Sequence, residues 1–353
     1  MLKPIRNLIS AGILAVLTAL AVGMARFLPV FWFSFYTDFS RKAMRIIGAV
    51  TGWIPFCLWQ VLAVLLVLSI PVGLAAAIKQ KRILGWLTGL VETAVLLVFL
   101  FVGLWGLNHY APTIGEQTGL EVQKSSVEEL ENAARWYAEQ ASAWSVRVDR
   151  DENDNVVLPD YGTLEDMAVA CYDRLGERNE RFADPVQAVK PLIASKAFSY
   201  TGTTGVFLCL TGEASVNTDT FPLNIPFTMC HELGHSLAVA AEDQANYCAY
   251  LACTASEDAL MRYSGFYNAF LYCVSALRRE DKDAAARVWE LCSEQLVRDA
   301  SANAAHNKQY EGKVQNTVQA VNDGYLKAFS HPSGVKSYGL VVDYLIAEYQ
   351  KNH

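Results

Sequence analysis

Three long apolar runs occupy most of the N-terminal third of the chain. Residues 7–25 and 46–78 contain no charged side chain, and residues 83–107 contain only Glu92. Each run is long enough to cross about 30 Å of hydrocarbon as a helix. A cleaved signal peptide explains the first run poorly, because no small-x-small cleavage site precedes soluble sequence. We predict three membrane helices, near residues 7–28, 54–78 and 83–108.

Beyond residue 111 the pattern changes to shorter, amphipathic segments. Two motifs of capping-box form, at residues 125–128 and 163–166, mark expected helix starts. A strand-like stretch covers residues 205–211, and we expect either an edge strand that pairs with an extended substrate or an ordinary core strand. Residues 112–353 are enough for one domain with a full core. Apolar positions recur at helical spacing over residues 126–143, 164–178, 256–278, 281–300, 312–328 and 335–350.

Charge separates the two parts of the chain and predicts an orientation. Nine Lys/Arg residues but only two acidic residues, Asp38 and Glu92, precede Pro112, so the remainder of the chain is acidic. Basic residues precede the first predicted span and join the second to the third, and such loops face the cytoplasm. Three spans then place residues 112–353 outside the cytoplasm. The acidic outer part argues against a nucleic-acid partner, and no Gly-rich phosphate loop indicates a nucleotide.

The loop after the first predicted span opposes this orientation, because Arg41, Lys42 and Arg45 lie in it. It is also amphipathic and rich in aromatic residues, so we interpret it as an anchor at the surface of the lipid bilayer. The eight cysteines show no disulfide or metal pattern. Cys57 lies within an apolar run and leaves an odd number outside, which weakens the assignment of the outer part to an oxidising compartment.

The sequence His-Glu-Leu-Gly-His at residues 231–235 carries the candidate chemistry. On a helix, His231 and His235 lie four residues apart on one face, so both imidazoles can bind one metal ion. Glu232 can reach a water bound to that metal, where a general base is needed. The alternative is a surface helix with two solvated histidines. The motif predicts a hydrolytic zinc site.

A catalytic zinc needs three protein ligands and one open position. Glu242 is the candidate third ligand and Asp243 its substitute, while helix capping is the alternative role of this pair. Asn246 lies one helical turn beyond Glu242, where its amide can orient a ligating histidine. A straight helix would carry Glu242 about 10 Å past His235. The chain must therefore turn within residues 236–241, which contain neither Gly nor Pro.

Several segments together resemble an uncharacterised bacterial membrane family, domain of unknown function 3810. They are residues 211–217, 225–235, 242–252 and 262–264, with the three apolar runs and shorter likenesses at 105–108 and 337–339. The Glu-x-x-Ala-Asn element at residues 242–246 is similar to the Glu-x-x-Ala-Asp of membrane-associated gluzincin peptidases. The resemblance implies that His231, His235 and Glu242 bind zinc and that Glu232 is the base. Ala238 and Gln244 depart from the family, where Gly and Glu are expected.

Together these observations predict a mainly α protein with three N-terminal transmembrane helices within residues 1–111. A helix-rich, zincin-like α+β domain with a small edge strand or sheet is expected to follow outside the cytoplasm. We expect a multi-pass protein of the bacterial cell membrane that hydrolyses peptide or protein substrates through a zinc-activated water, with Glu232 as the base.

Two other functions are weighed against this one. A non-catalytic zinc-binding membrane receptor or scaffold is the alternative, and an intramembrane protease is disfavoured because no long apolar run flanks the motif. The oxyanion partner is not identified. Side chains considered as substrate or oxyanion contacts, each with a core, capping or surface role as its alternative, are Glu213, Tyr263, Tyr325, His331 and Tyr338.

Overall fold

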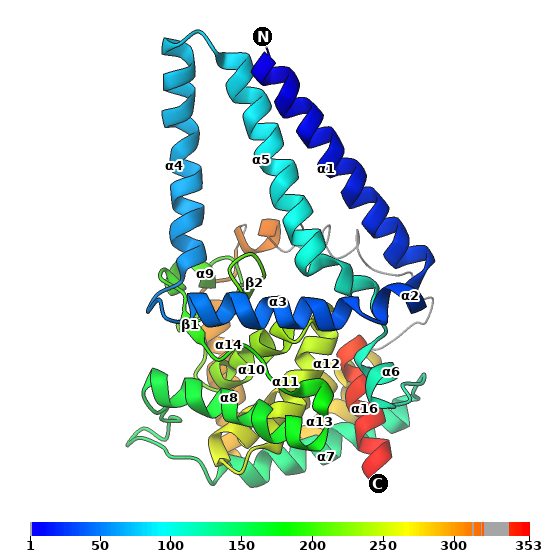
Figure 1. The fold of residues 1–353 in the computed structure, drawn as a ribbon. Helices are drawn as coiled ribbons and strands as arrows, with labels where there is room; N and C mark the ends of the chain where they lie inside the picture. The colour runs from blue at the N-terminus through cyan, green and yellow to red at the C-terminus, as the bar shows by residue number, and fades with distance from the viewer. Residues whose placement is uncertain (1, 313, 319, 321–338) are drawn as a thin grey trace.

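The computed structural model describes residues 2–312, 314–318, 320 and 339–353. Three long helices rise from one side of a helical body that contains a small three-stranded sheet (Figure 1). Each of the three is long and apolar enough to cross a membrane, which indicates that the chain associates with one. They are α1 (Leu2–Phe27), α4 (Leu58–Lys79) and α5 (Ile83–Leu104).

Two of the apolar helices are shorter than the predicted spans, for local reasons. α4 begins at Leu58 rather than near residue 54, because residues 51–54 form a turn and Cys57 is extended (φ −65°, ψ 98°). α5 ends at Leu104 rather than residue 108, because the backbone of Trp105 leaves helical geometry (φ −148°). A 3₁₀ turn, η1 (Gly106–Tyr110), follows and leads the chain into the body.

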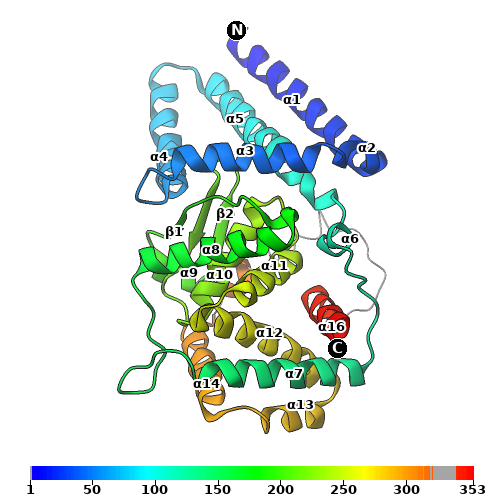
Figure 2. The ribbon, with the colours of Figure 1, turned by 60° about the horizontal axis from the view of Figure 1, so that its bottom comes forward.

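An amphipathic helix, α3 (Tyr36–Thr51), lies across the base of the three apolar helices, after the short helix α2 (Pro29–Phe33) (Figures 1 and 2). One face of α3 is buried, at Tyr36, Ser40, Met44, Gly48 and Thr51. Apolar side chains on other faces of α3 are exposed, at Phe39, Ile46 and Val50. The surface anchor expected from the sequence of this loop stays a prediction.

The sheet consists of β1 (Val189–Pro191), β2 (Gly205–Leu208) and β3 (Glu213–Val216), in the order β1-β3-β2. β1 is parallel to β3, and β2 is antiparallel to it. The predicted strand over residues 205–211 therefore ends early and turns into a hairpin. Gly212 permits the turn with φ +61°, and a Cβ there would lie 2.7 Å from the backbone nitrogen of Gly48. The turn thus packs directly on α3.

The helical body buries large aromatic side chains, among them Tyr137, Tyr172 and Phe270. None of the eight cysteines, all within the described residues, forms a disulfide, and seven are buried. The elements of the body are α6 (Ile114–Thr118), α7 (Val127–Ser145), α8 (Tyr161–Arg178), η2 (Glu180–Phe182), α9 (Ser195–Ser199), α10 (Asn224–Ser236), α11 (Glu242–Ala255), α12 (Ala259–Glu280), α13 (Lys282–Trp289), α14 (Glu294–Lys308) and α16 (Leu340–Asn352).

Several predicted helix boundaries need correction. The capping box of α7 pairs Ser126 with Glu129, one residue later than predicted. α8 begins before Thr163, because the carboxylate of Asp160 accepts the Thr163 N–H (3.1 Å). The predicted helix over residues 281–300 is two helices, α13 and α14, the second capped by Ser293. Most of the predicted helix at residues 312–328 lies outside the described residues.

Candidate metal centre

The His-Glu-x-x-His motif lies on α10, which is buried along nearly its whole length. His231 and His235 project from the same face, with ring centroids 4.6 Å apart. Their Nε2 atoms are 3.0 Å apart. The surface-helix alternative requires solvated rings, but the side chains of His231 and His235 are only 12% and 7% exposed.

A sharp bend follows α10 and returns the chain toward the histidines. The helix ends at Ser236, and the N–H of Ala238 donates to the carbonyl of His235 (3.0 Å). Ala238 has φ +63°, the left-handed conformation that glycine adopts at helix ends. This is the position where the family is expected to have Gly, so an alanine performs the same turn at a conformational cost of about 1–2 kcal/mol.

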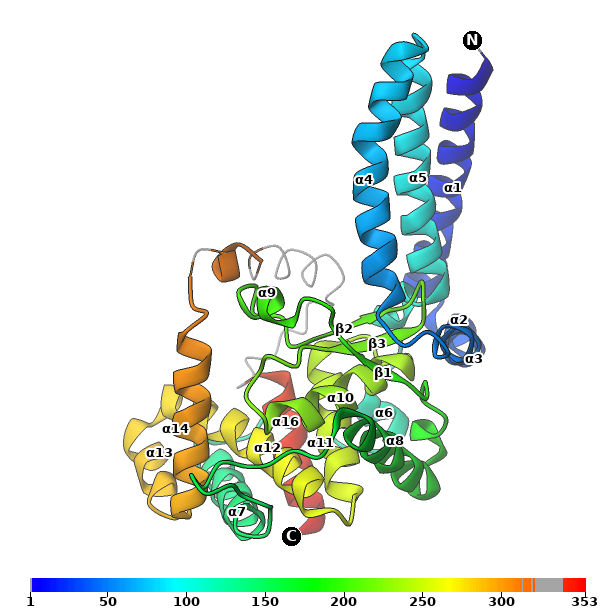
Figure 3. The same ribbon diagram turned by 90° about the vertical axis from the view of Figure 1, so that its left-hand side faces the viewer.

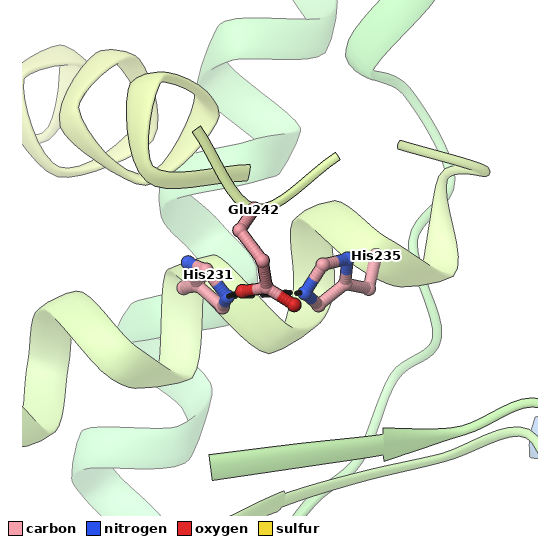
Figure 4. A group of neighbouring side chains, drawn as sticks. All are labelled: His231, His235 and Glu242. Carbon is pink, nitrogen blue, oxygen red and sulfur yellow. Dashed lines mark hydrogen bonds and ion pairs between the residues drawn. The ribbon is translucent and has the colours of Figure 1, made fainter. Parts of the chain in front are cut away.

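The bend brings Glu242, the first residue of α11, over the two imidazoles (Figure 4). Its Oε2 lies 3.2 Å from Nε2 of His231 and 3.8 Å from Nε2 of His235. Two ligand atoms of a tetrahedral zinc lie about 3.3 Å apart, given bonds of about 2.0–2.1 Å. The three donor atoms, 3.0 to 3.8 Å apart, therefore form a cluster that could hold a metal ion. Asp243, the substitute ligand, is not part of this cluster.

Hydrogen bonds on the far side of each ring set the histidine tautomers. Nδ1 of His231 donates to Oδ1 of Asn246 (2.8 Å), and Nδ1 of His235 donates to the carbonyl of Val239 (2.7 Å). In the neutral rings, both Nε2 atoms then carry lone pairs that face each other and Glu242. Acceptor atoms this close together are stable around a cation. Histidines that bind metals commonly donate their other ring N–H to a carbonyl or carboxylate group, as these two rings do.

Charge at the cluster favours a bound cation. Burial raises the pKa of Glu242, but hydrogen bonds to His231 and His235 outweigh it and hold this pKa well below its usual value. Burial likewise lowers the pKa of His235, but its hydrogen bond to Glu242 and the negative charges of Glu242 and Glu232 together outweigh this and raise the pKa to about 9. The same negative potential that attracts a proton attracts a metal ion, which binds neutral imidazole and displaces that proton.

Glu232 is buried beside the cluster, 3% exposed, and its Oε2 has no hydrogen-bond partner among the described residues. Burial raises its pKa to about 7, against the lowering effect of His231 and His235. Gly205 of β2 packs on this carboxylate so closely that a Cβ there would collide with Oε1 of Glu232. A buried carboxylate without a partner is costly, so the orphan oxygen fits a base that meets a water or substrate proton.

A cavity of about 760 Å³ opens in front of the cluster. β2 lies along it through residues 205–207, and β2 is one of the two edge strands of the described sheet. Helix α12 contributes Asn268 and Tyr272. The end of α5 contributes Phe101 and Trp105, and the indole of Trp105 donates to the carbonyl of His235 (3.0 Å). The cavity is therefore bounded by both the helical body and an apolar helix.

Glu213 is not among the residues that line this cavity, and of its two expected roles, substrate contact and capping, its contacts favour capping. Its side chain is 1% exposed, and both oxygens accept backbone N–H groups at the start of α4, from Leu58 and Trp59 (2.9 Å each). Oε1 also pairs with Nζ of Lys190 (2.6 Å). Glu213 therefore caps α4, where a negative charge stabilises the helix dipole.

The remaining predicted contacts also lie elsewhere. Tyr263 is fully buried and donates to Oδ2 of Asp299 (2.6 Å), away from the cavity. Tyr325, His331 and Tyr338 lie outside the described residues. Gln244, where the family resemblance led us to expect Glu, accepts the N–H of Ile114 (2.7 Å) and so joins α11 to α6.

Sequence reasoning missed three groups near the centre. Tyr272 and Asn268 line the cavity. Their spacing of four on one helix, which places them on the same face, is the sequence feature that could have identified them. Burial and the neighbouring His235 lower the pKa of His109 to about 4, which places a neutral imidazole close to the cluster. Nothing in the sequence around His109 indicated this, because η1 lies far before α10 in the chain, with the sheet and several helices between them.

One comparison with known proteins gives a match. The model of a family described as a protein of unknown function (DUF3810) matches residues 35–346, a span that contains α3, two of the apolar helices and the complete metal cluster. No curated protein and no solved structure matches the chain.

Proposed function

The chain belongs to the DUF3810 family of proteins of unknown function, and we propose that it is a membrane-anchored, zinc-dependent metallopeptidase. The observation that carries the proposal is the convergence of His231, His235 and Glu242, with the partnerless carboxylate of Glu232 beside them. Two imidazoles and one carboxylate are the ligand set of several zinc peptidases, with a fourth position free for water. We place the outer part of the chain among zincin-like folds on this basis.

In this mechanism the side chains of the protein hold the reactants and move one proton. Zinc, when bound, supplies a water of lowered pKa and a Lewis acid that polarises a carbonyl. Glu232 accepts a proton from the attacking water and passes it to the leaving amine. Asn246 and the carbonyl of Val239 keep His231 and His235 in the tautomer that binds metal. The contact of Gly205 with Glu232 holds that carboxylate toward the cavity.

The edge strand β2 is the proposed docking site for the peptide. Residues 205–207 lie along the cavity wall, with the pairing edge away from β3 unoccupied by the other described strands. An extended peptide can add to such an edge through backbone hydrogen bonds, whatever its side chains are. This geometry presents a backbone carbonyl of the peptide to the cluster. It favours a peptide bond over other bonds as the target.

We further propose that α1, α4 and α5 each cross the membrane and that the helical body lies outside the cytoplasm. Lys79, Lys81 and Arg82 surround the turn between α4 and α5, at the end of these helices remote from the body (Figure 1). Loops with such basic residues face the cytoplasm. The protein is then multi-pass, with its zinc site in the opposite compartment.

The test is zinc-dependent cleavage of a broad peptide library by the full chain in lipid nanodiscs. We expect cleavage that a chelator removes and zinc restores. Glu232→Gln should retain zinc and lose roughly 100-fold or more in turnover, because the base is removed while the ligands remain. Turnover at the original rate by Glu232→Gln would refute the assigned base. Zinc binding without any cleavage would favour the receptor or scaffold function.

A further inference from the structure

The wall of the candidate active-site cavity is formed in part by an apolar helix. Phe101 lies in the last turn of α5 and Trp105 immediately follows it, and both line the cavity. Trp105 touches the metal centre directly, through its hydrogen bond to the carbonyl of His235 and through edge-to-face packing on that ring. It also packs against Phe207 of the edge strand, with centroids 6.1 Å apart. No linker separates α5 from the site.

The length of α5 fixes the depth of the site relative to the bilayer. Its 22 residues extend about 33 Å at 1.5 Å per residue, slightly more than the roughly 30 Å of hydrocarbon. Trp105 therefore falls at the membrane interface, where tryptophan is enriched. Its ring centroid lies 5.9 Å from that of His235. The headgroup layer is itself about 5–7 Å thick on each side, so the metal centre lies at headgroup depth.

Other elements place the same side of the body against lipid. α2 and α3 cross beneath the spans (Figure 1) and carry exposed apolar side chains at Val30, Phe31, Phe39, Ile46 and Val50. Trp53, just after α3, is 90% exposed. α9 precedes the cavity segment at residues 201–207, and β2 contains the end of this segment. Both elements lie on the side of the body from which the three helices rise (Figure 3).

From this placement we infer that the substrate is a polypeptide anchored in the same bilayer, cut in the segment that emerges from its own span. The inference rests on the proposed peptidase function and names its substrate class. A soluble peptide has to enter the headgroup layer to reach His231 and Glu232. A segment that leaves the bilayer beside α5 is already at that depth, and its anchor raises its local concentration to the millimolar range that short tethers give.

The geometry also sets where the cut falls. About two residues of extended chain, at roughly 3.3–3.6 Å each, cover the distance from the interface to the centre. About five or six further residues are needed to lie along β2 and the cavity, so the scissile bond lies within roughly ten residues of the anchor. Beyond that length the advantage of the anchor declines, since effective concentration falls with about the −3/2 power of tether length.

The activity test uses full-length protein in liposomes and paired reporters. Each reporter carries the same randomised segment with a fluorophore. One reporter is free, and the others are fused to a Leu/Ala transmembrane span. The fusion is either direct or made through flexible Gly/Ser spacers of increasing length. We expect the directly anchored reporter to be cut roughly 10-fold faster or more than the free one at equal concentration, with the advantage declining as the spacer grows. Equal rates for free and anchored reporters would overturn the inference but leave the peptidase intact. Cleavage of neither would refute the peptidase function.

A second measurement tests the depth without any catalysis. Nitroxide labels report depth through their accessibility to oxygen and to a nickel chelate. One label is placed on Thr203→Cys, in the cavity wall. The other is placed on Glu139→Cys, an exposed position of α7, which lies at the far end of the body (Figure 1). We expect the label at 203 to lie within about 10 Å of the lipid phosphates and the label at 139 to be fully aqueous. Matching aqueous signals at both positions would overturn the inference.

Discussion

Each imidazole of the candidate metal centre is held by a hydrogen bond on the side remote from Glu242. His231 uses an amide, Asn246, and His235 uses a backbone carbonyl, that of Val239. Both bonds leave Nε2 as the nitrogen that faces Glu242, so the two rings differ in hydrogen-bond partner but share one tautomer. Glu242 is the more exposed member of the cluster, at 47% of its side chain. Its contribution to metal affinity is therefore the first quantity to measure at the residue scale.

Glu242→Ala should reduce zinc affinity by roughly 10-fold or more, because losing even an outer-shell partner of a ligand costs about 10–100-fold. Metal content of the purified full chain, titrated against a competing chelator, measures this. Asp243→Ala is the matched control, since Asp243 lies next to Glu242 but outside the cluster, and its affinity should stay within about twofold. Unchanged zinc affinity in Glu242→Ala would reject it as a ligand.

At the element scale, the bend between α10 and α11 brings the third ligand back to the first two. It needs one left-handed residue, and this chain uses alanine there, at φ +63°. The start of α11, just after the bend, is held by Gln244, whose side chain accepts the N–H of Ile114 at the start of α6. The bend therefore depends on contacts at both ends and not on a glycine. This explains why a sequence without Gly or Pro in residues 236–241 still turns.

Ala238→Gly should stabilise the protein by roughly 0.5–1 kcal/mol, because glycine adopts this conformation without a Cβ clash. Thermal unfolding in detergent should show a rise of about 1–3 °C. Ala240→Gly, two residues on and without a positive φ, is the control and should destabilise the protein, since glycine there only adds freedom to the unfolded chain. A lower melting temperature for Ala238→Gly would contradict the proposed strain.

At the scale of the whole molecule, the apolar helices and the body are joined by a buried charge network. Lys190 of β1 binds Glu213 of β3 and also the carbonyl of Thr51 at the end of α3 (2.8 Å). Glu213 in turn caps α4, and Trp59 of α4 donates to Ser215 of β3 (3.0 Å). The sheet that lies along the cavity is thus fixed to two helices of the membrane part. Movement of one part requires breaking these bonds.

Glu213→Gln should destabilise the full chain by about 3–5 kcal/mol, because it leaves the buried ammonium of Lys190 without its counter-charge. The double variant Glu213→Gln/Lys190→Met should recover part of this loss, since no unpaired charge remains. Thermal unfolding in nanodiscs measures both. Strictly additive losses in the double variant would mean that the pair is not energetically coupled.

The orientation of the molecule can be tested with two introduced cysteines. A membrane-impermeant maleimide should label Glu139→Cys on α7 in intact cells, whereas Lys81→Cys between α4 and α5 should react only after permeabilisation. Seven of the eight native cysteines are buried, so background labelling should be low. The reverse pattern would place the helical body in the cytoplasm.

Features that depend on local spacing could be predicted from the amino-acid sequence. Apolar runs of sufficient length gave three candidate spans within a few residues of their observed ends, and a spacing of four placed His231 and His235 on one helix face. Both results follow from the fixed rise and period of the α-helix. The amphipathic pattern before Trp53 likewise indicated a helix at the surface.

Contacts between residues far apart in the chain depend instead on the packing of the whole fold. It turned Glu242 back onto the histidines, assigned Glu213 to the cap of α4 rather than to substrate, and brought Trp105 against the metal centre. These contacts join residues up to 155 positions apart, and no local spacing encodes them. They arise because burial of the apolar surface of many helices at once selects one packing, and that packing brings these distant side chains together.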